Sequence, residues 1–262
     1  MQIIAVCNQK GGVGKTTTTL SLAACAAAAG DAVLLVDLDP HASLTLSLGL
    51  ETADARGGAY ALLAQTLSLS ELARPTAVAG MDIIASGPAL ATLERDQRRS
   101  PGMGRRLQTI CRAQAGAYRW VFADTPPTLG VLMINALAAA DHVVIPTQPD
   151  PLSRHGVTGM VKTLDMVNRS RPIPLGHSIV TTFYDRRTRS SLNGFEALSA
   201  DHGGALWPDV IPVDTQFREA SSRGLPLSRC RGASRGAAAY EQLWSHLLQR
   251  LPQPAASPAE VA

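Results

Sequence analysis

Residues 10–17 read Lys-Gly-Gly-Val-Gly-Lys-Thr-Thr, a glycine-rich run that carries two lysines. Glycines let successive backbone N–H groups turn toward one anion, and a helix that follows directs the positive end of its dipole at the same point. The ending Gly-Lys-Thr is that of a phosphate-binding loop, in which the lysine contacts the β- and γ-phosphates and the threonine hydroxyl binds Mg²⁺. The run therefore predicts a nucleotide-binding site made of Gly11, Gly12, Val13, Gly14, Lys15, Thr16 and Thr17.

Lys10 is a second cation at the mouth of this loop, where Gln9 replaces the glycine of the ordinary motif. We expect its side chain to point away from the helix that begins near residue 16, so that it can reach a nucleotide held by a second subunit. We predict catalytic roles for Lys15 within the chain and for Lys10 across a subunit interface.

Three carboxylates follow apolar runs that have the pattern of buried strands. Asp37 and Asp39 follow residues 32–36, and Asp124 ends a second such run. Strand ends of this kind face the crevice where ligands bind in parallel sheets. We predict that Asp39 orients the attacking water, and that Thr16, Asp39 and Asp124 contribute to a Mg²⁺ site. Asp37 either supports the ion through water or holds its loop.

A loop after the last predicted strand lies on the base side of this crevice. It reads Ile-Pro-Val-Asp-Thr-Gln-Phe-Arg over residues 211–218. Backbone groups around Pro212, Val213 and Asp214 are candidates for recognising adenine. The alternative, an ordinary loop between a strand and a helix, stays open at this point.

Apolar runs that suit strands alternate with helical patterns along the chain. We expect strands at 2–7, 32–36, 81–85, 119–123, 142–147, 178–183 and 209–212, and helices at 16–29, 59–66, 88–99, 103–114, 130–139, 156–169, 190–201, 216–222 and 234–251. This alternation predicts an α/β fold with a doubly wound, mostly parallel sheet flanked by helices. We interpret residues 1–251 as a single P-loop domain and the proline-rich residues 252–262 as a disordered tail.

The composition is ordinary for a soluble protein, with 24 basic and 21 acidic side chains. Residues 151–250 hold 13 basic and 8 acidic side chains, which permits a polyanionic partner but does not require one. The four cysteines form no Cys-x-x-Cys pair and are typical of reduced packing residues. Because the sequence shows neither a signal peptide pattern nor an apolar run long enough for a bilayer, we expect a cytoplasmic protein.

Four segments together resemble the ParA/MinD family of deviant Walker A ATPases, and more closely its ParA/Soj branch. They are residues 8–17, 37–40 (Asp-Leu-Asp-Pro), 124–127 (Asp-Thr-Pro-Pro) and 183–188 (Phe-Tyr-Asp-Arg-Arg-Thr), and the resemblance runs from residue 1 to about residue 250. It implies an ATPase with slow basal turnover that uses ATP and Mg²⁺. It also implies a homodimer that sandwiches ATP between its subunits.

The resemblance makes Lys10 the signature lysine that crosses to the partner's nucleotide, and Asp39 the hydrolytic aspartate. The family usually has glutamine after the pair that Asp39 and Pro40 form here, whereas His41 stands at that position in this chain. A histidine donates a similar hydrogen bond, but its charge changes near neutral pH. We interpret this departure as variation within a subgroup that keeps its activity.

ParA-like members bind DNA non-specifically as ATP dimers, and a cargo-linked ParB-like or adaptor protein stimulates hydrolysis and releases them. The resemblance thus implies a nucleoid-associated protein that positions a chromosome, plasmid, chemotaxis array or carboxysome. Phosphate contacts require positive charge and no base-reading element. Suitable arginines are Arg186, Arg187, Arg189, Arg218, Arg229, Arg231 and Arg235, although a solvated arginine face explains the same pattern.

Two other functions stay open. MinD relatives end in an amphipathic membrane helix, and the last predicted helix here places one apolar face at Tyr240, Leu243, Trp244, Leu247, Leu248 and Leu251. Its polar face offers mainly Arg250 as a cation, so we expect it to pack on the sheet and not on a membrane. A metabolic P-loop enzyme similar to dethiobiotin synthetase is the other alternative, against which Lys10 and the Asp-Leu-Asp-Pro segment argue.

Overall fold

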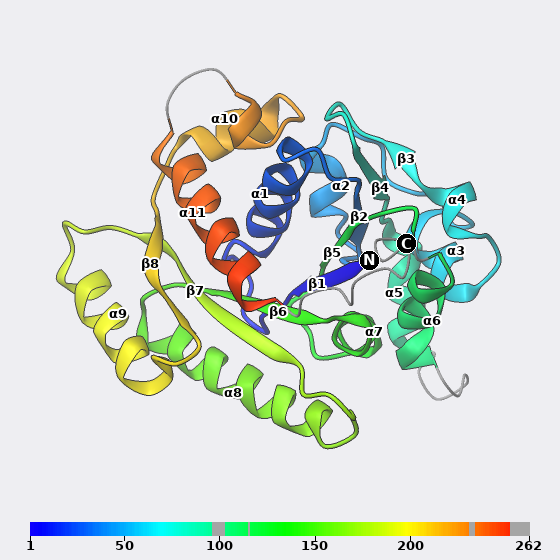
Figure 1. Ribbon diagram of the computed structural model, residues 1–262. Coiled ribbons are helices and arrows are strands. Elements are labelled where there is room, and N and C mark those ends of the chain that lie inside the picture. Colours follow the sequence, from blue (N-terminus) through cyan, green and yellow to red (C-terminus); the bar gives the residue numbers. More distant parts are fainter. Residues whose placement is uncertain (96–102, 115, 231–233, 252–262) are drawn as a thin grey trace, which may run out of the picture.

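The computed structural model describes residues 1–95, 103–114, 116–230 and 234–251 (Figure 1). Within them, eight strands form one sheet in the order β3-β4-β2-β5-β1-β6-β7-β8. The strands are β1 (Gln2–Val6), β2 (Val33–Asp37), β3 (Arg74–Pro75), β4 (Met81–Ile84), β5 (Trp120–Asp124), β6 (His142–Thr147), β7 (Gly176–Tyr184) and β8 (Leu206–Pro212). All neighbouring strands are parallel except β3 and β4. The predicted doubly wound, mostly parallel α/β fold is confirmed.

Each predicted strand is present, with bounds that differ by three residues or fewer. The sequence does not predict β3, which is two residues long, lies at the sheet edge and contains Pro75. Proline lacks a backbone N–H and is tolerated in sheets chiefly at such edges. The predicted tail at 252–262 and residues 96–99 of one predicted helix lie outside the described residues.

Helices join the strands and cover both faces of the sheet (Figure 1). They are α1 (Lys15–Ala28), α2 (Ser43–Ser47), α3 (Gly58–Ala64), α4 (Leu69–Leu72), α5 (Ala91–Arg95), α6 (Arg106–Ala113), α7 (Val131–Ala139), α8 (Pro151–Asn168), α9 (Arg189–His202), α10 (Gln216–Ser222) and α11 (Arg235–Arg250), with the 3₁₀ turns η1 (Pro88–Leu90), η3 (Met103–Arg105) and η4 (Leu227–Arg229). The sequence predicts each of the longer helices and misses the short α2 and α4.

The start of α8 differs from the prediction by more than a turn. The helix begins at Pro151, not near residue 156, and Asp150 caps it by accepting a hydrogen bond from the Ser153 backbone N–H. Aspartate at the N-cap followed by proline at the first helical position is a recognised start signal. The signal was present in the sequence, and the prediction overlooked it.

Successive residues of a strand pack into two different hydrophobic clusters, one on each face of the sheet. Ile3 and Ala5 of β1 belong to a buried cluster with residues of α3, α6, α7 and α8, whereas Ile4 and Val6 belong to a second cluster with residues of α1 and α11. A strand covered on both faces needs apolar residues at every position. This explains why these strands appear in the sequence as continuous apolar runs.

The strand register brings the predicted site residues together. In the parallel pairing of β2 with β5, Asp37 lies beside Asp124, and Asp124 lies beside Val6 of β1 on its other side. The glycine-rich loop follows Val6 directly. The ends of β1, β5 and β2 thus place the loop and both carboxylates at the same edge of the sheet.

The apolar face of α11 packs on the sheet, as predicted. Tyr240, Leu243, Trp244 and Leu247 are buried, and the Trp244 ring meets the Trp120 ring edge-on with centroids 4.8 Å apart. Leu248, predicted to share this face, is instead 38% exposed. Within the described part of the chain, no helix combines the length and the apolar character needed to cross a membrane.

A buried hydrogen bond ties α11 to the helix of the glycine-rich loop. The Tyr240 hydroxyl lies 2.8 Å from Thr18 Oγ1, and both side chains are buried. The C-terminal helix is therefore joined to α1 by a polar contact as well as by apolar packing.

His142, the first residue of β6, is 4% exposed, and its Nε2 lies 2.9 Å from Ser178 Oγ. Burial, reinforced by His177, Arg250 and His246, lowers the pKa of His142 from 6.5 to about 4. The folded protein therefore keeps this imidazole neutral where the unfolded chain protonates it. Its contribution to stability is fully present above pH 6.5 and is lost as pH falls through about 4.

We predict that replacing His142 by Gln makes the free energy of unfolding depend less on pH below neutrality. Between pH 6.5 and pH 4, the wild type should lose about 3 kcal/mol of unfolding free energy through this residue. Urea unfolding of both proteins at pH 8, 6 and 4 measures the difference. His155→Gln, which removes an exposed histidine of α8, is the matched control. Equal pH slopes for His142→Gln and the wild type would contradict this account.

Candidate active site

The glycine-rich loop connects β1 to α1 and has a shape that requires glycine at two positions. Gly12 (φ 73°) and Gly14 (φ 86°) lie in the left-handed region, which residues with a Cβ rarely adopt. Because α1 begins at Lys15, the first backbone N–H groups of a 14-residue helix face the loop. The loop therefore has the strand–loop–helix geometry that the sequence predicts for a phosphate site.

Two side chains from neighbouring strands anchor this loop. Gln148 Nε2 donates a hydrogen bond to the Gly12 carbonyl (2.9 Å), and Thr182 Oγ1 donates one to the Val13 carbonyl (2.9 Å). Gln148 follows β6 and Thr182 lies in β7, so both anchors come from outside the predicted motif. The anchors hold the loop in a defined shape before a ligand binds, which reduces the ordering cost of binding.

Lys15 is buried in the loop, with 8% of its surface exposed. Its Nζ donates a hydrogen bond to the Lys10 carbonyl at 3.1 Å. Burial lowers the pKa of Lys15, and the carboxylates of Asp124 and Asp39 oppose that shift. The ammonium group thus lies across the mouth of the loop, where phosphate oxygens would supply further negative charge.

Thr16 and Asp124 contact each other directly. Thr16 Oγ1 donates a hydrogen bond to Asp124 Oδ2 at 2.7 Å, and Thr19 Oγ1 lies 3.4 Å from the other carboxylate oxygen. Asp124 is fully buried, and burial followed by the charge of Asp37 raises its pKa. A cation in this place would stabilise the carboxylate form.

Asp37 uses both carboxylate oxygens within the protein. Oδ1 accepts a hydrogen bond from the Asp39 backbone N–H (3.1 Å), and Oδ2 accepts from the backbone N–H (2.9 Å) and hydroxyl (2.7 Å) of Thr45. Of the two roles that the sequence leaves open for Asp37, this arrangement favours holding the loop. Asp37 fixes the segment that presents Asp39.

Asp39 lies at the mouth of the site and is 9% exposed. Its Oδ1 accepts a hydrogen bond from the His41 backbone N–H (2.9 Å) and lies 2.9 Å from His41 Nδ1. Among the described residues, none bonds to the other carboxylate oxygen. That oxygen is available to a water molecule, as the predicted positioning role requires.

The donor set at this edge suits Mg²⁺, because Thr16, Asp39 and Asp124 all offer oxygen. In residues 1–95, 103–114, 116–230 and 234–251, no group of three or more His, Cys, Asp and Glu side chains is arranged to hold a metal ion. Mg²⁺ does not need such a cage, since it keeps several waters and binds phosphate oxygens. Thr16 would hold the ion with the nucleotide, and Asp124, bonded to Thr16, would orient that hydroxyl.

Lys10 forms an ion pair inside its own chain. Its Nζ lies 2.9 Å and 3.1 Å from the carboxylate oxygens of Asp150 and 2.7 Å from Ser153 Oγ. The side chains of Lys10 and Asp150 are each 30% exposed. Sequence reasoning missed these partners, because Asp150 is 140 residues away and the N-cap of α8 was not predicted. The role of Lys10 across a subunit interface stays a prediction.

A cavity of about 570 Å³ continues from the loop to the segment after β8. It is lined by Gly14 and Thr17 on the loop side and by Phe183, Pro212, Val213, Arg218 and Tyr240 among others. The size and the mixture of aromatic and backbone surface suit a nucleoside. The segment at 212–214 lines this cavity, and its role in recognising adenine stays a prediction.

Two details of this cavity add to what the sequence predicts. The Asp214 carboxylate accepts hydrogen bonds from the backbone N–H groups of Gln216 and Gly236 and from the Ser234 hydroxyl, so it is committed to the fold and leaves only backbone groups for a base. Phe183 (φ 52°) is in the left-handed region and 47% exposed at the cavity wall. No local pattern in the sequence predicts that backbone conformation for a phenylalanine.

The candidate DNA-binding arginines do not gather at one point. Arg186, Arg187 and Arg235 line a hollow of about 610 Å³ beside β8, where Arg187 pairs with Asp185 at 2.8 Å. Arg218 lines the cavity of about 570 Å³ beside the glycine-rich loop instead. Arg189 begins α9 and Arg229 ends η4, both exposed. Arg231 lies outside the described residues.

Comparison with known proteins agrees with this geometry. A family model described as an AAA domain matches residues 1–175. The chromosome-partitioning ATPase Soj of Thermus thermophilus is 38% identical over 251 residues, which cover 95% of this chain and 96% of Soj. The sporulation initiation inhibitor protein Soj of Bacillus subtilis is 35% identical over 243 residues, which cover 92% of this chain and 96% of that protein.

A solved structure shows the same fold with a ligand. The cobyrinic acid a,c-diamide synthase of Mycobacterium smegmatis, with a bound ATP analogue and magnesium, superimposes with a TM-score of 0.82 at 31% identity and 95% coverage of both chains. The loop, the strand-end carboxylates and these relatives lead to one conclusion. The chain belongs to the ParA/MinD family of P-loop ATPases, in its ParA/Soj branch.

Proposed function

We propose that this protein is a ParA-like positioning ATPase of the cytoplasm. ATP and Mg²⁺ assemble two copies into a sandwich dimer, the dimer binds nucleoid DNA without sequence preference, and a cargo-linked ParB-like or adaptor protein stimulates hydrolysis and releases it. The observation that carries the proposal is the second lysine of the loop, Lys10, beside a complete phosphate site. The partitioning role of the Soj relatives supports it.

The ion pair of Lys10 gives this proposal a physical requirement. A single chain satisfies the Lys10 ammonium with Asp150 and Ser153, so the lysine has no need of a second subunit until something competes for it. A triphosphate carries more negative charge than one carboxylate and therefore attracts the Lys10 ammonium more strongly at the same distance. Transfer of Lys10 to a partner's phosphates would therefore require nucleotide in the partner's site.

The hydrolytic step would depend on position more than on proton transfer. Lys15 and Mg²⁺ would stabilise charge on the transferred phosphoryl group, and Asp39 would hold the attacking water in line. The exposed His41 ring occupies one Asp39 oxygen, so part of the carboxylate is already committed. Slow basal turnover is consistent with this arrangement and keeps the dimer assembled until the partner arrives.

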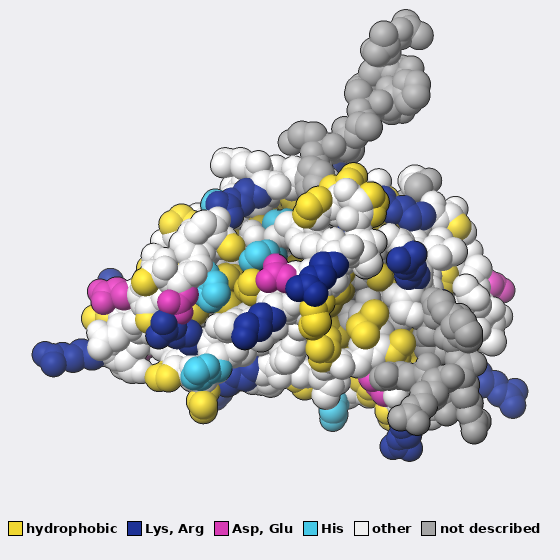
Figure 2. All heavy atoms as spheres, turned by 90° about the horizontal axis from the view of Figure 1, so that it is seen from below, with side chains coloured by type: hydrophobic (Ala, Val, Ile, Leu, Met, Phe, Trp, Pro, Cys, Tyr) yellow, Lys and Arg dark blue, Asp and Glu magenta, His cyan; other side chains and the backbone are white. Residues whose placement is uncertain are grey.

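The DNA-binding surface would be electrostatic. The hollow lined by Arg186, Arg187 and Arg235 also contains Asp185 and Asp209, which limits its net positive charge. The face shown in Figure 2 carries basic side chains spread among fewer acidic ones. Non-specific binding requires only that enough cations reach phosphates at once, so a surface formed by two copies would suffice.

A biosynthetic enzyme is the second candidate, because the similar structure from M. smegmatis carries the name of an amide synthase. An enzyme of that class would turn over ATP only with its small-molecule substrate. ATP turnover that rises with DNA and a protein partner, in the absence of any small-molecule substrate, would support the positioning ATPase. Turnover that stays at the basal rate under those conditions would support the biosynthetic enzyme.

Lys15→Ala should abolish nucleotide binding. The change removes a buried cation that has no substitute at the phosphates, and we expect affinity for a fluorescent ATP analogue to fall about a hundredfold or more. Lys162→Ala, which removes an exposed lysine of α8, is the control and should bind normally. Equal affinities in the two variants would show that Lys15 does not contact the phosphates.

Asp39→Ala should bind ATP but hydrolyse it about a hundredfold more slowly, because the water loses its positioning group. The ATP-bound state then persists, and light scattering after size exclusion should show a dimer with ATP and Mg²⁺ and a monomer with ADP. Asp165→Ala, an exposed aspartate of α8, should behave as the wild type. Normal hydrolysis by Asp39→Ala would overturn its assignment.

DNA binding in the presence of ATP should weaken by about a thousandfold or more between 50 and 200 mM salt, if six or more phosphates are contacted. The triple variant Arg186→Gln, Arg187→Gln, Arg235→Gln should bind more weakly and show a shallower salt slope. The control Arg56→Gln, Arg74→Gln removes exposed cations elsewhere. A mobility-shift response that is flat in salt would refute electrostatic DNA binding.

A further inference from the structure

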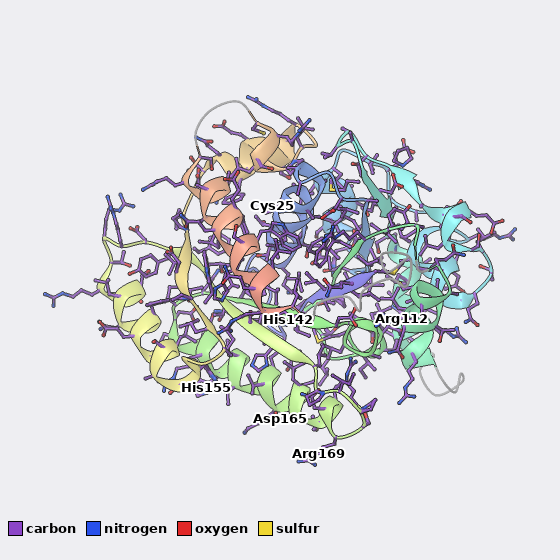
Figure 3. The ribbon with its side chains drawn as sticks, viewed as in Figure 1. Cys25, Arg112, His142, His155, Asp165 and Arg169 are labelled. Atoms are coloured by element: carbon purple, nitrogen blue, oxygen red, sulfur yellow. The ribbon has the colours of Figure 1, made fainter. Side chains whose placement is uncertain are left out.

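A second cavity, of about 830 Å³, lies at the edge of the sheet where β6 and β7 begin. Its walls come from α6, the end of α7, the segment after α8 and the end of α11. Figure 3 labels two of its residues, Arg112 on α6 and His142 at the start of β6. The glycine-rich loop lies at the opposite ends of the strands, so this cavity shares no residue with the candidate active site. Its volume is in the range of small-molecule sites.

The lining of this cavity is strongly basic. Four arginines line it, whereas Asp141 is its sole carboxylate among the described residues. Asp141 is already committed, because Oδ1 accepts a hydrogen bond from Arg112 at 2.6 Å and Oδ2 accepts one from the Ile3 backbone N–H at 2.9 Å. One arginine is thus neutralised, and three positive charges remain.

The other three guanidinium groups donate hydrogen bonds only to neutral acceptors or to none, and Arg171 also lies within the electrostatic influence of Asp141. Arg171 donates to the carbonyls of Leu137, Ala138 and Ala140 at the end of α7. Arg250 donates to the Gly204 carbonyl at 3.2 Å. Arg105 has no side-chain hydrogen bond or ion pair with the described residues. Carbonyl groups orient a guanidinium without cancelling its charge, so the cavity keeps its positive potential.

Two histidines, His142 and His177, also line the cavity. Burial is the main cause that lowers the pKa of both; Arg250 adds to the shift of His142, whereas Asp165 opposes that of His177. The cavity is therefore polarised for an anion even with both imidazoles neutral. Arginine is also the side chain best suited to phosphate and carboxylate, because its planar fork donates two parallel hydrogen bonds.

We propose that this cavity binds a small polyanion, a molecule that carries two or more phosphate or carboxylate groups close together. The three uncompensated guanidinium groups line one hollow and are not spread along a ridge, which suits a compact ligand better than a duplex backbone. The site is separate from the ATP site, so the ligand would bind at the same time as ATP and would not compete with it.

Isothermal titration with inorganic tripolyphosphate tests this proposal. The Lys15→Ala protein without Mg²⁺ removes binding at the phosphate loop, and we expect one tripolyphosphate to bind per chain. Adding Arg105→Gln and Arg250→Gln should weaken that binding about tenfold or more. The control Arg56→Gln, Arg74→Gln removes the same charge outside the cavity and should change it little. Thermal unfolding of each variant checks that it is folded. If the double variant is unfolded, the single variant Arg105→Gln replaces it in the titration.

Citrate in place of tripolyphosphate identifies the anionic group. Binding of tripolyphosphate alone supports a phosphorylated ligand, and binding of citrate supports a polycarboxylate. Equal weakening by the cavity variant and its control, or no binding of either anion, would overturn the proposal. Displacement of tripolyphosphate by a short DNA duplex, lost when Arg105 and Arg250 are changed, would overturn the small ligand and assign the hollow to DNA.

Discussion

Two fully buried carboxylates, Asp37 and Asp124, lie side by side at the ends of β2 and β5, and the active site depends on how the protein tolerates them. Buried charges are costly unless hydrogen bonds or opposite charges compensate them. Asp37 accepts hydrogen bonds from the Asp39 backbone N–H and from the backbone N–H and hydroxyl of Thr45 in α2, and Asp124 accepts one from Thr16 at the start of α1. Their compensation fixes the loop that carries Asp39 and the helix that follows the phosphate loop. Mg²⁺ would supply the positive charge that these hydrogen bonds do not provide.

The two lysines of the loop have opposite relationships to this site. Lys15 is buried, and its ammonium group interacts electrostatically with the carboxylates of Asp124 and Asp39. The fold of one chain therefore fixes its position. Lys10 is partly exposed and occupied by Asp150 and Ser153, so its place depends on what competes with that ion pair. One chain can thus prepare its nucleotide site fully, and the proposed role of Lys10 in a second subunit would require the ion pair with Asp150 to break.

Local sequence patterns predict most of this fold because its strands are buried on both faces. A continuous apolar run such as Trp-Val-Phe-Ala before Asp124 is typical of a buried strand. Gly12 and Gly14 of the phosphate-loop motif both have the positive φ that glycine allows. The contacts that finish the site escape such reasoning. Gln148, Asp150 and Thr182 lie far along the chain from the loop they hold, and only the strand order β1-β6-β7 brings them there.

The burial of α11 limits how this protein can associate with other surfaces. Freeing the helix would expose Tyr240, Leu243, Trp244 and Leu247, at about 1.5–3 kcal/mol for each large apolar side chain, and would leave the Thr18 hydroxyl without its partner. The sum, on the order of 10 kcal/mol, rivals the entire folding free energy of a typical domain. Any reversible attachment that leaves the fold intact must therefore use side chains that are already exposed, without the release of α11.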